Sequence, residues 1–139
     1  MSTLLRKSLV ASLFALSSLV MPGAHAQAAT PLNYEGIPIG AYSVVAQVRA
    51  KPGKEDALRA ATLPLIDLVR GDPKNLVYFL QEDRAKPGHF IFYEVFASEA
   101  DFEAHNAKPY VQDWFAKLPD LAEGGVEAMR MIILGPSRK

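Results

Sequence analysis

The sequence has 139 residues, equal numbers of basic and acidic side chains (15 of each) and no cysteine. The missing cysteine excludes disulfide bonds, thiolate nucleophiles and zinc–thiolate or iron–sulfur sites. The basic residues form no cluster suited to a nucleic-acid backbone or to anionic lipid, so we expect neither partner.

Residues 1–26 have the three zones of a secretory signal peptide. A basic start, an apolar run over residues 9–21 and a small-residue cleavage site ending at Ala26 follow one another. A membrane anchor is the alternative, but the run is shorter than the roughly 20 apolar residues that a spanning helix needs. We therefore predict that the mature chain begins at Gln27 and is exported, either secreted or periplasmic, with no membrane partner after cleavage.

The mature chain begins with residues 27–41, which are rich in proline and glycine and predict an extended arm outside the core. Residues 42–50 alternate between an apolar and a mixed face, as a half-buried strand does. An amphipathic helix is predicted over residues 55–70. Pro64 removes one backbone hydrogen bond from this helix, but the apolar stripe keeps its phase, so we expect a kink and not a break.

Residues 76–82 and 90–96 predict two strands joined by a polar hairpin, with His89 in contact with solvent. The second of these strands is apolar on both faces, which predicts helices on one face and a second subunit on the other.

The last third of the chain predicts two helices and a strand. Ser98 and Asp101 resemble a capping box at the start of the first helix. Pro109 fits the first position of the second helix, and Pro119 is expected to end it. A turn at residues 123–125 leads to a strand over 126–134, with a tail over 135–139.

This order of elements predicts an α+β domain over residues 42–134. It matches the ferredoxin-like βαββαβ arrangement, in which an antiparallel four-stranded sheet carries its helices on one face.

Several short segments match a known family in a fixed order. They are residues 44–46, 51–54, 63–65 and 88–94, together with Ser98, His105 and the pair Leu118-Pro119. On these segments, residues 42–134 resemble the antibiotic biosynthesis monooxygenase (ABM) family of dimeric α/β barrels, which includes quinol monooxygenases. The resemblance implies a homodimer with a pocket between sheet and helices in each subunit. It also implies oxygenation of an electron-rich aromatic, such as a hydroquinone, by molecular oxygen without a metal or another cofactor.

His105 is the candidate catalytic residue, because a histidine pKa near about 6.5 suits acid–base chemistry. The alternative is a histidine hydrogen-bonded at the seam between helix and sheet. The candidate substrate-binding residues are aromatic or polar and surround it in the predicted fold: Phe92, Glu94, Phe96, Asn106, Tyr110 and Trp114.

Two of these residues leave alternatives open. A carboxylate between aromatic side chains must be paired or have a raised pKa, and for Glu94 we favour an ion pair with Arg130 or Arg49. Phe96 stands where the family usually has tryptophan. That departure motivates a second hypothesis, a non-catalytic dimeric small-molecule binding protein of the same fold. A relative of the isomerase type is a third hypothesis and requires a polar pocket.

Overall fold

We analysed a computed structural model of the chain, which describes residues 34–134. The predicted signal peptide, most of the predicted arm and the tail lie outside the described residues. Within them, four strands and four α-helices follow a short 3-10 helix: η1 (Tyr34–Gly36), β1 (Tyr42–Ala50), α1 (Glu55–Thr62), α2 (Leu65–Arg70), β2 (Asn75–Glu82), β3 (His89–Phe96), α3 (Glu99–Asn106), α4 (Pro109–Leu121) and β4 (Ala122–Ile132).

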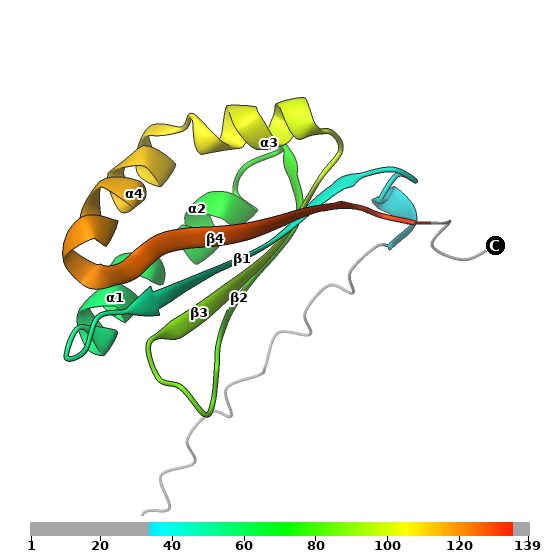
Figure 1. Cartoon of the computed structure of the whole chain (residues 1–139). Coiled ribbons are helices and arrows are strands. Elements are labelled where there is room, and N and C mark those ends of the chain that lie inside the picture. Colours follow the sequence, from blue (N-terminus) through cyan, green and yellow to red (C-terminus); the bar gives the residue numbers. More distant parts are fainter. Residues whose placement is uncertain (1–33, 135–139) are drawn as a thin grey trace, which may run out of the picture. The chain divides into compact units, whose positions relative to one another are not determined.

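The strands form one antiparallel sheet in the order β2-β3-β1-β4. The helices lie together on one face of this sheet, so the domain has two layers (Figure 1). The α+β class and the predicted order of strands and helices are confirmed.

Strand register decides which side chains face the helices. Val44 of β1 lies opposite Glu94 of β3 on one side and Arg130 of β4 on the other. Because residues directly opposite in a sheet share a face, these three side chains project toward the helices. Tyr78 of β2 is also opposite Glu94 and joins them.

The predicted helix over residues 55–70 is two helices, α1 and α2. Leu63 and Pro64 link them and keep right-handed helical backbone angles. Pro64 has no N–H to donate to the preceding turn, and the chain tightens there: Ile66 donates its N–H to the carbonyl of Leu63 at 3.1 Å. The expectation of a single kinked helix is therefore wrong, although the apolar stripe continues across the link.

Both predicted helix starts in the last third are confirmed. The Ser98 hydroxyl accepts a hydrogen bond from the Asp101 N–H at 3.2 Å, and Pro109 opens α4. Pro119, however, does not end α4, which continues to Leu121. A proline in the last turn removes only one backbone hydrogen bond, and the Lys51 ammonium donates to the Pro119 carbonyl at 2.5 Å.

The last strand begins earlier than predicted, at Ala122. The expected turn at residues 123–125 is a bulge inside β4, where one residue of β1 lies opposite three residues of β4. Gly124 and Gly125 occupy this bulge with φ values of 69° and 75°. Only glycine adopts such angles readily, so these two residues extend the strand through a distortion that would otherwise end it.

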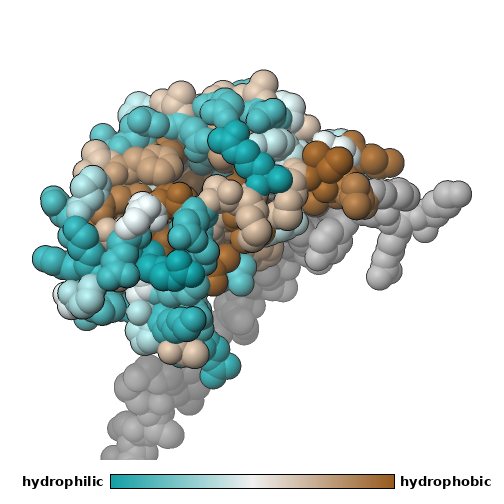
Figure 2. Space-filling view, viewed as in Figure 1, coloured by the Kyte–Doolittle hydropathy of each residue, from teal (hydrophilic) through white to brown (hydrophobic). Residues whose placement is uncertain are grey.

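The main hydrophobic core lies between the sheet and the helices, and a smaller cluster around Ala41, Val77 and Val95 lies on the other face. The end of the predicted arm is attached to this second cluster, since Gly40 donates its N–H to the Ile133 carbonyl at 3.0 Å. An exposed apolar patch lies beside it where β4 ends (Figure 2), with Ile39, Ile132 and Leu134 more than half exposed. Among the described residues, no helix is both long and apolar enough to cross a bilayer.

Candidate functional site

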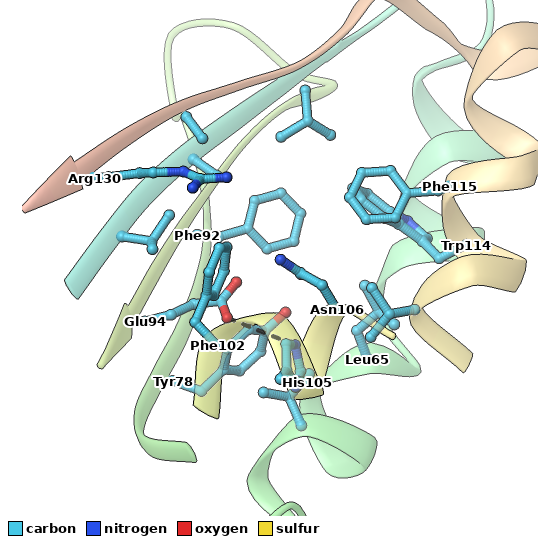
Figure 3. A pocket seen from close by; sticks show the side chains of 16 residues that line it. Leu65, Tyr78, Phe92, Glu94, Phe102, His105, Asn106, Trp114, Phe115 and Arg130 are labelled. Atoms are coloured by element: carbon cyan, nitrogen blue, oxygen red, sulfur yellow. Dashed lines mark ion pairs between the residues drawn. The ribbon is translucent and has the colours of Figure 1, made fainter. Parts of the chain in front are cut away.

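A cavity of about 200 Å³ lies between the sheet and the helices. Its walls are mostly apolar, with a few polar side chains among them (Figure 3). The lining residues are Val44, Ala46, Leu65, Val69, Tyr78, Phe92, Glu94, Phe102, His105, Asn106, Val111, Trp114, Phe115, Val126, Ala128 and Arg130. Five of the predicted site residues, Phe92, Glu94, His105, Asn106 and Trp114, are among them.

His105 lies in the last turn of α3 and is almost completely buried, with 3% of its surface exposed. Its Nδ1 lies 3.1 Å from Oδ2 of Asp72 and 3.3 Å from the Tyr110 hydroxyl. Its Nε2 lies 3.8 Å from Oε2 of Glu94, on the cavity side of the ring. The two ring nitrogens therefore have different surroundings, one facing a buried carboxylate and the other facing the cavity.

Asp72 is the buried anion behind the histidine. Burial acts to raise its pKa, but hydrogen bonds from the Lys74 N–H, from His105 and from the Lys108 ammonium outweigh burial and lower the pKa. Lys108 Nζ lies 3.3 Å from the second carboxylate oxygen. An ionised Asp72 can only accept hydrogen bonds, so the proton between the two groups belongs to Nδ1 of His105.

The net charge on His105 follows from two opposed effects. Burial lowers its pKa, and the hydrogen bond and charge of Asp72 only partly offset that shift. At neutral pH the ring is therefore neutral, with its proton on Nδ1 and the lone pair of Nε2 directed toward the cavity. This is the protonation state that a general base requires.

Glu94 projects from β3 into the same end of the cavity. Burial raises the pKa of this carboxyl from 4.5 to about 7. The expected ion pair with an arginine is wrong. Arg130 pairs with two carboxylates of α3, and Arg49 with Glu127 of β4. Neither partner is available because Arg49 lies on the opposite face of the sheet and Arg130 bends over the ring of Phe102. The alternative expectation, a raised pKa of the Glu94 carboxyl, is confirmed.

Two predicted substrate-binding residues lie outside the cavity lining. Phe96 is fully buried and packs its ring against Phe102 and His105, with centroid distances of 5.5 and 5.1 Å. Tyr110 contacts the Nδ1 side of His105, and burial raises the pKa of its hydroxyl to about 12. Both residues support the histidine and do not face the space a ligand would fill.

The aromatic wall opposite His105 is held by a buried hydrogen bond. Phe92 meets Trp114 edge to face, with ring centroids 5.4 Å apart. The indole N–H of Trp114 donates to Oγ1 of Thr62 at 3.1 Å, and this hydroxyl in turn donates to the Leu58 carbonyl at 2.7 Å. Because the polar atom of Trp114 is satisfied by α1, its ring presents an apolar surface to the cavity.

Sequence reasoning missed Asp72 and Tyr78. Asp72 follows α2 in a Gly-Asp-Pro turn that indicates only a helix end, and it reaches His105 across 33 positions of the chain. Tyr78 was assigned to a strand, but its face could not be chosen without the register.

His89 was expected to contact solvent and is buried instead, with Nε2 2.8 Å from Oε1 of Gln47 on the opposite face of the sheet. The described residues contain no cluster of three metal-ligating side chains.

Comparison with known proteins gives one family match. The family model described as antibiotic biosynthesis monooxygenase matches residues 41–117. The crystal structure of protein SO0527 from Shewanella oneidensis has 33% sequence identity and a TM-score of 0.61, covering 70% of this chain and 96% of that one. A solved structure named antibiotic biosynthesis monooxygenase has 24% identity and a TM-score of 0.63, covering 68% of this chain and 99% of that one, and this supports the fold alone.

A curated relative is also similar. The uncharacterized protein sll1783 from Synechocystis is 30% identical over 78 residues, which are 56% of this chain and 53% of that protein. The chain therefore matches about half the length of this relative.

Proposed function

Because the chain belongs to the antibiotic biosynthesis monooxygenase family, we propose that it is a cofactor-independent monooxygenase acting on an electron-rich hydroxyaromatic such as a hydroquinone. The observation that carries the proposal is the buried His105, whose Nδ1 is hydrogen-bonded to Asp72 and whose Nε2 faces the cavity, while burial keeps the ring neutral. Eleven of the sixteen lining residues are aliphatic, phenylalanine or tryptophan. Such walls suit an aromatic ring and disfavour the sugar-like ligand of an isomerase.

In the proposed reaction His105 accepts the proton of one substrate hydroxyl at Nε2. The resulting phenolate is a much stronger electron donor than the neutral hydroquinone, and it transfers electrons to molecular oxygen in the apolar cavity. One oxygen atom bonds to a ring carbon and the other leaves as water with two hydrogens of the substrate. A hydroquinone thus becomes a hydroxyquinone, and the four electrons that it loses reduce one O₂.

We further propose that the enzyme works as a homodimer. The sheet face opposite the helices carries exposed apolar side chains, with Phe79, Met129 and Met131 each exposed by 39–61%. A groove of about 310 Å³ on this face is lined partly by Val45 and Ile91. A second copy is the occupant that fits the resemblance to dimeric relatives, and its binding would bury these side chains.

Export completes the proposal and rests on the signal-like residues 1–26. An exported enzyme of this kind would act on hydroxyaromatics outside the cytoplasm, as a secreted or periplasmic protein. Expression of the full chain in a bacterial host, followed by fractionation and N-terminal sequencing, tests this part. Mature protein that begins at Gln27 in the periplasm or medium supports export, and uncleaved protein retained in the cytoplasm refutes it.

Oxygen consumption tests the activity. The mature chain is incubated in air with a panel of substituted hydroquinones, the spontaneous rate is subtracted, and the product is analysed after reaction in ¹⁸O₂. We expect protein-dependent oxygen uptake and one ¹⁸O atom in the quinone product. His105→Gln should abolish the uptake, whereas His89→Gln is the matched control, a histidine on the opposite face of the sheet.

Two results contradict the proposal. Uptake that is unchanged in His105→Gln removes the histidine from the reaction. Saturable binding of the panel without any oxygen uptake would assign the chain to the second hypothesis, a non-catalytic binding protein.

A further inference from the structure

Two polar atoms at one end of the cavity are buried without a hydrogen-bond partner among the described residues. They are the Tyr78 hydroxyl and Oε2 of Glu94. Tyr78 is 4% exposed and Glu94 is 9% exposed, so water does not cover them at the outer surface. A buried polar group left unpaired costs about 1–3 kcal/mol. Two such groups side by side in a cavity wall indicate that a bound group outside the described residues forms hydrogen bonds with them.

The strand register places these two side chains together. Tyr78 of β2 lies directly opposite Glu94 of β3, and both project toward the helices. The charge of Glu94 is one of the causes that raise the pKa of the Tyr78 hydroxyl, after burial itself. Figure 3 shows the same end of the cavity, where the Glu94 carboxyl and Tyr78 are grouped with His105.

The chemistry of the three groups restricts what can bind between them. The Tyr78 hydroxyl remains protonated and offers a donor, whereas Nε2 of His105 offers an acceptor, as does Oε2 of Glu94 once this carboxyl is ionised, above its pKa of about 7. A hydroxyl group on a ligand has one donor and two acceptor positions, so it can accept from Tyr78 and donate to Glu94 or His105. An ether has no donor, and a carboxylate would add a negative charge beside Glu94 and the buried Asp72.

We propose that Tyr78 and Glu94 form a subsite for one un-ionised hydroxyl group of an aromatic ligand, and that Tyr78 selects hydroxyl over ether and carboxylate. The inference rests on the proposed function in that the bound hydroxyl is the one His105 deprotonates. It adds the orientation of the ligand, with one hydroxyl at the Tyr78 end and the ring against Phe92 and Trp114.

Binding without oxygen tests the subsite separately from the reaction. Isothermal titration calorimetry under nitrogen compares 1-naphthol, its methyl ether 1-methoxynaphthalene and 1-naphthoate, which share a ring and differ at one group. We expect wild-type protein to bind 1-naphthol at least about tenfold more tightly than either analogue, because only the hydroxyl satisfies both unpaired atoms.

The variant Tyr78→Phe removes the donor and keeps the ring. We expect it to weaken 1-naphthol binding about tenfold and to leave 1-methoxynaphthalene within about twofold, so that the preference disappears. Its melting temperature should not fall, because the Tyr78 hydroxyl donates to no other described residue and the change removes no hydrogen bond within this part of the chain. Tyr93→Phe is the matched control, since Tyr93 is on β3 but faces the opposite side of the sheet.

The outcomes separate the two proposals. Equal affinity for naphthol and its ether, no binding of any of the three, or a Tyr78→Phe variant that keeps the preference each overturns the subsite. A clear preference for naphthol that Tyr78→Phe abolishes, in a protein that consumes no oxygen with any hydroquinone, establishes the subsite and refutes the oxygenase.

Discussion

Replacing Glu94 by glutamine tests the electrostatics of the cavity through stability alone. The pKa of this carboxyl is about 7 in the folded protein and has an ordinary value of 4.5. A raised pKa means that the folded state prefers the protonated form. This contribution to stability is therefore complete below pH 4.5 and is lost as the pH rises through 7.

The magnitude follows from the two pKa values. Each pKa unit corresponds to about 1.36 kcal/mol, so a shift from 4.5 to about 7 is worth about 3 kcal/mol. Glutamine has the shape of the protonated acid and no charge to bury. We expect Glu94→Gln and wild type to be similar in stability at pH 5, and the variant to be more stable by up to about 3 kcal/mol at pH 8.5.

Urea unfolding at fixed protein concentration, followed by fluorescence of the single tryptophan, measures this difference. His105 has a lowered pKa and therefore destabilises the folded protein on the acid side, in the wild type and the variant alike. Glu123→Gln, at an exposed position near the start of β4, is the control for loss of one carboxylate. If the free energy of unfolding of wild type and of Glu94→Gln differs by the same amount from pH 5 to 8.5, the buried, unpaired state of Glu94 is refuted.

Three further predictions concern the support of the site. Asp72→Asn should lower hydroquinone-dependent oxygen uptake about tenfold and move the acid limb of the pH–rate profile to lower pH, since the charge that raises the pKa of His105 is removed; an unchanged profile would contradict this positioning role. Thr62→Val should cost about 1–3 kcal/mol in urea unfolding, because it leaves the buried Trp114 N–H without an acceptor; a neutral effect would mean that another acceptor replaces it. Gly88→Ala should cost about 1–3 kcal/mol, because φ is 82° there and a Cβ would lie 2.8–2.9 Å from side chains of α1 and β1; thermal unfolding measures the loss, and an unchanged melting temperature would count against it.

The fold could be predicted from the sequence because the patterns that indicate its strands and helices are local. Alternating apolar residues over 42–50 and the capping pair at Ser98 and Asp101 each report on a few neighbouring positions, and the structure places β1 and α3 there. Predictions at Pro64 and at residues 123–125 were wrong because both segments have two local solutions. A proline can kink a helix or divide it, and a glycine pair can turn a strand or form a bulge within it.

The candidate site could be predicted only partly from the sequence, for a different reason. Alternation along β3 correctly placed Phe92, Glu94 and Phe96 on one face. It could not show that the strand end at Phe96 is covered by Phe102 of α3, whereas the middle of the strand borders the cavity. The position of a residue along the strand decides whether it borders the cavity. Only the placement of the helices over the sheet shows which positions they cover.

The cavity itself arises from unequal side-chain sizes across the sheet. Its floor on β1 and β4 includes the small residues Val44, Ala46 and Ala128, whereas β3 contributes the ring of Phe92. Close-packed interiors normally fill such differences with larger residues on the facing helix. Here the lining from α3 includes Asn106 and His105, polar side chains whose burial in a filled apolar core would cost free energy. A core that combines small floor residues with polar groups from α3 is less stable than a filled one. It is therefore better explained by selection for a bound ligand than by selection for stability.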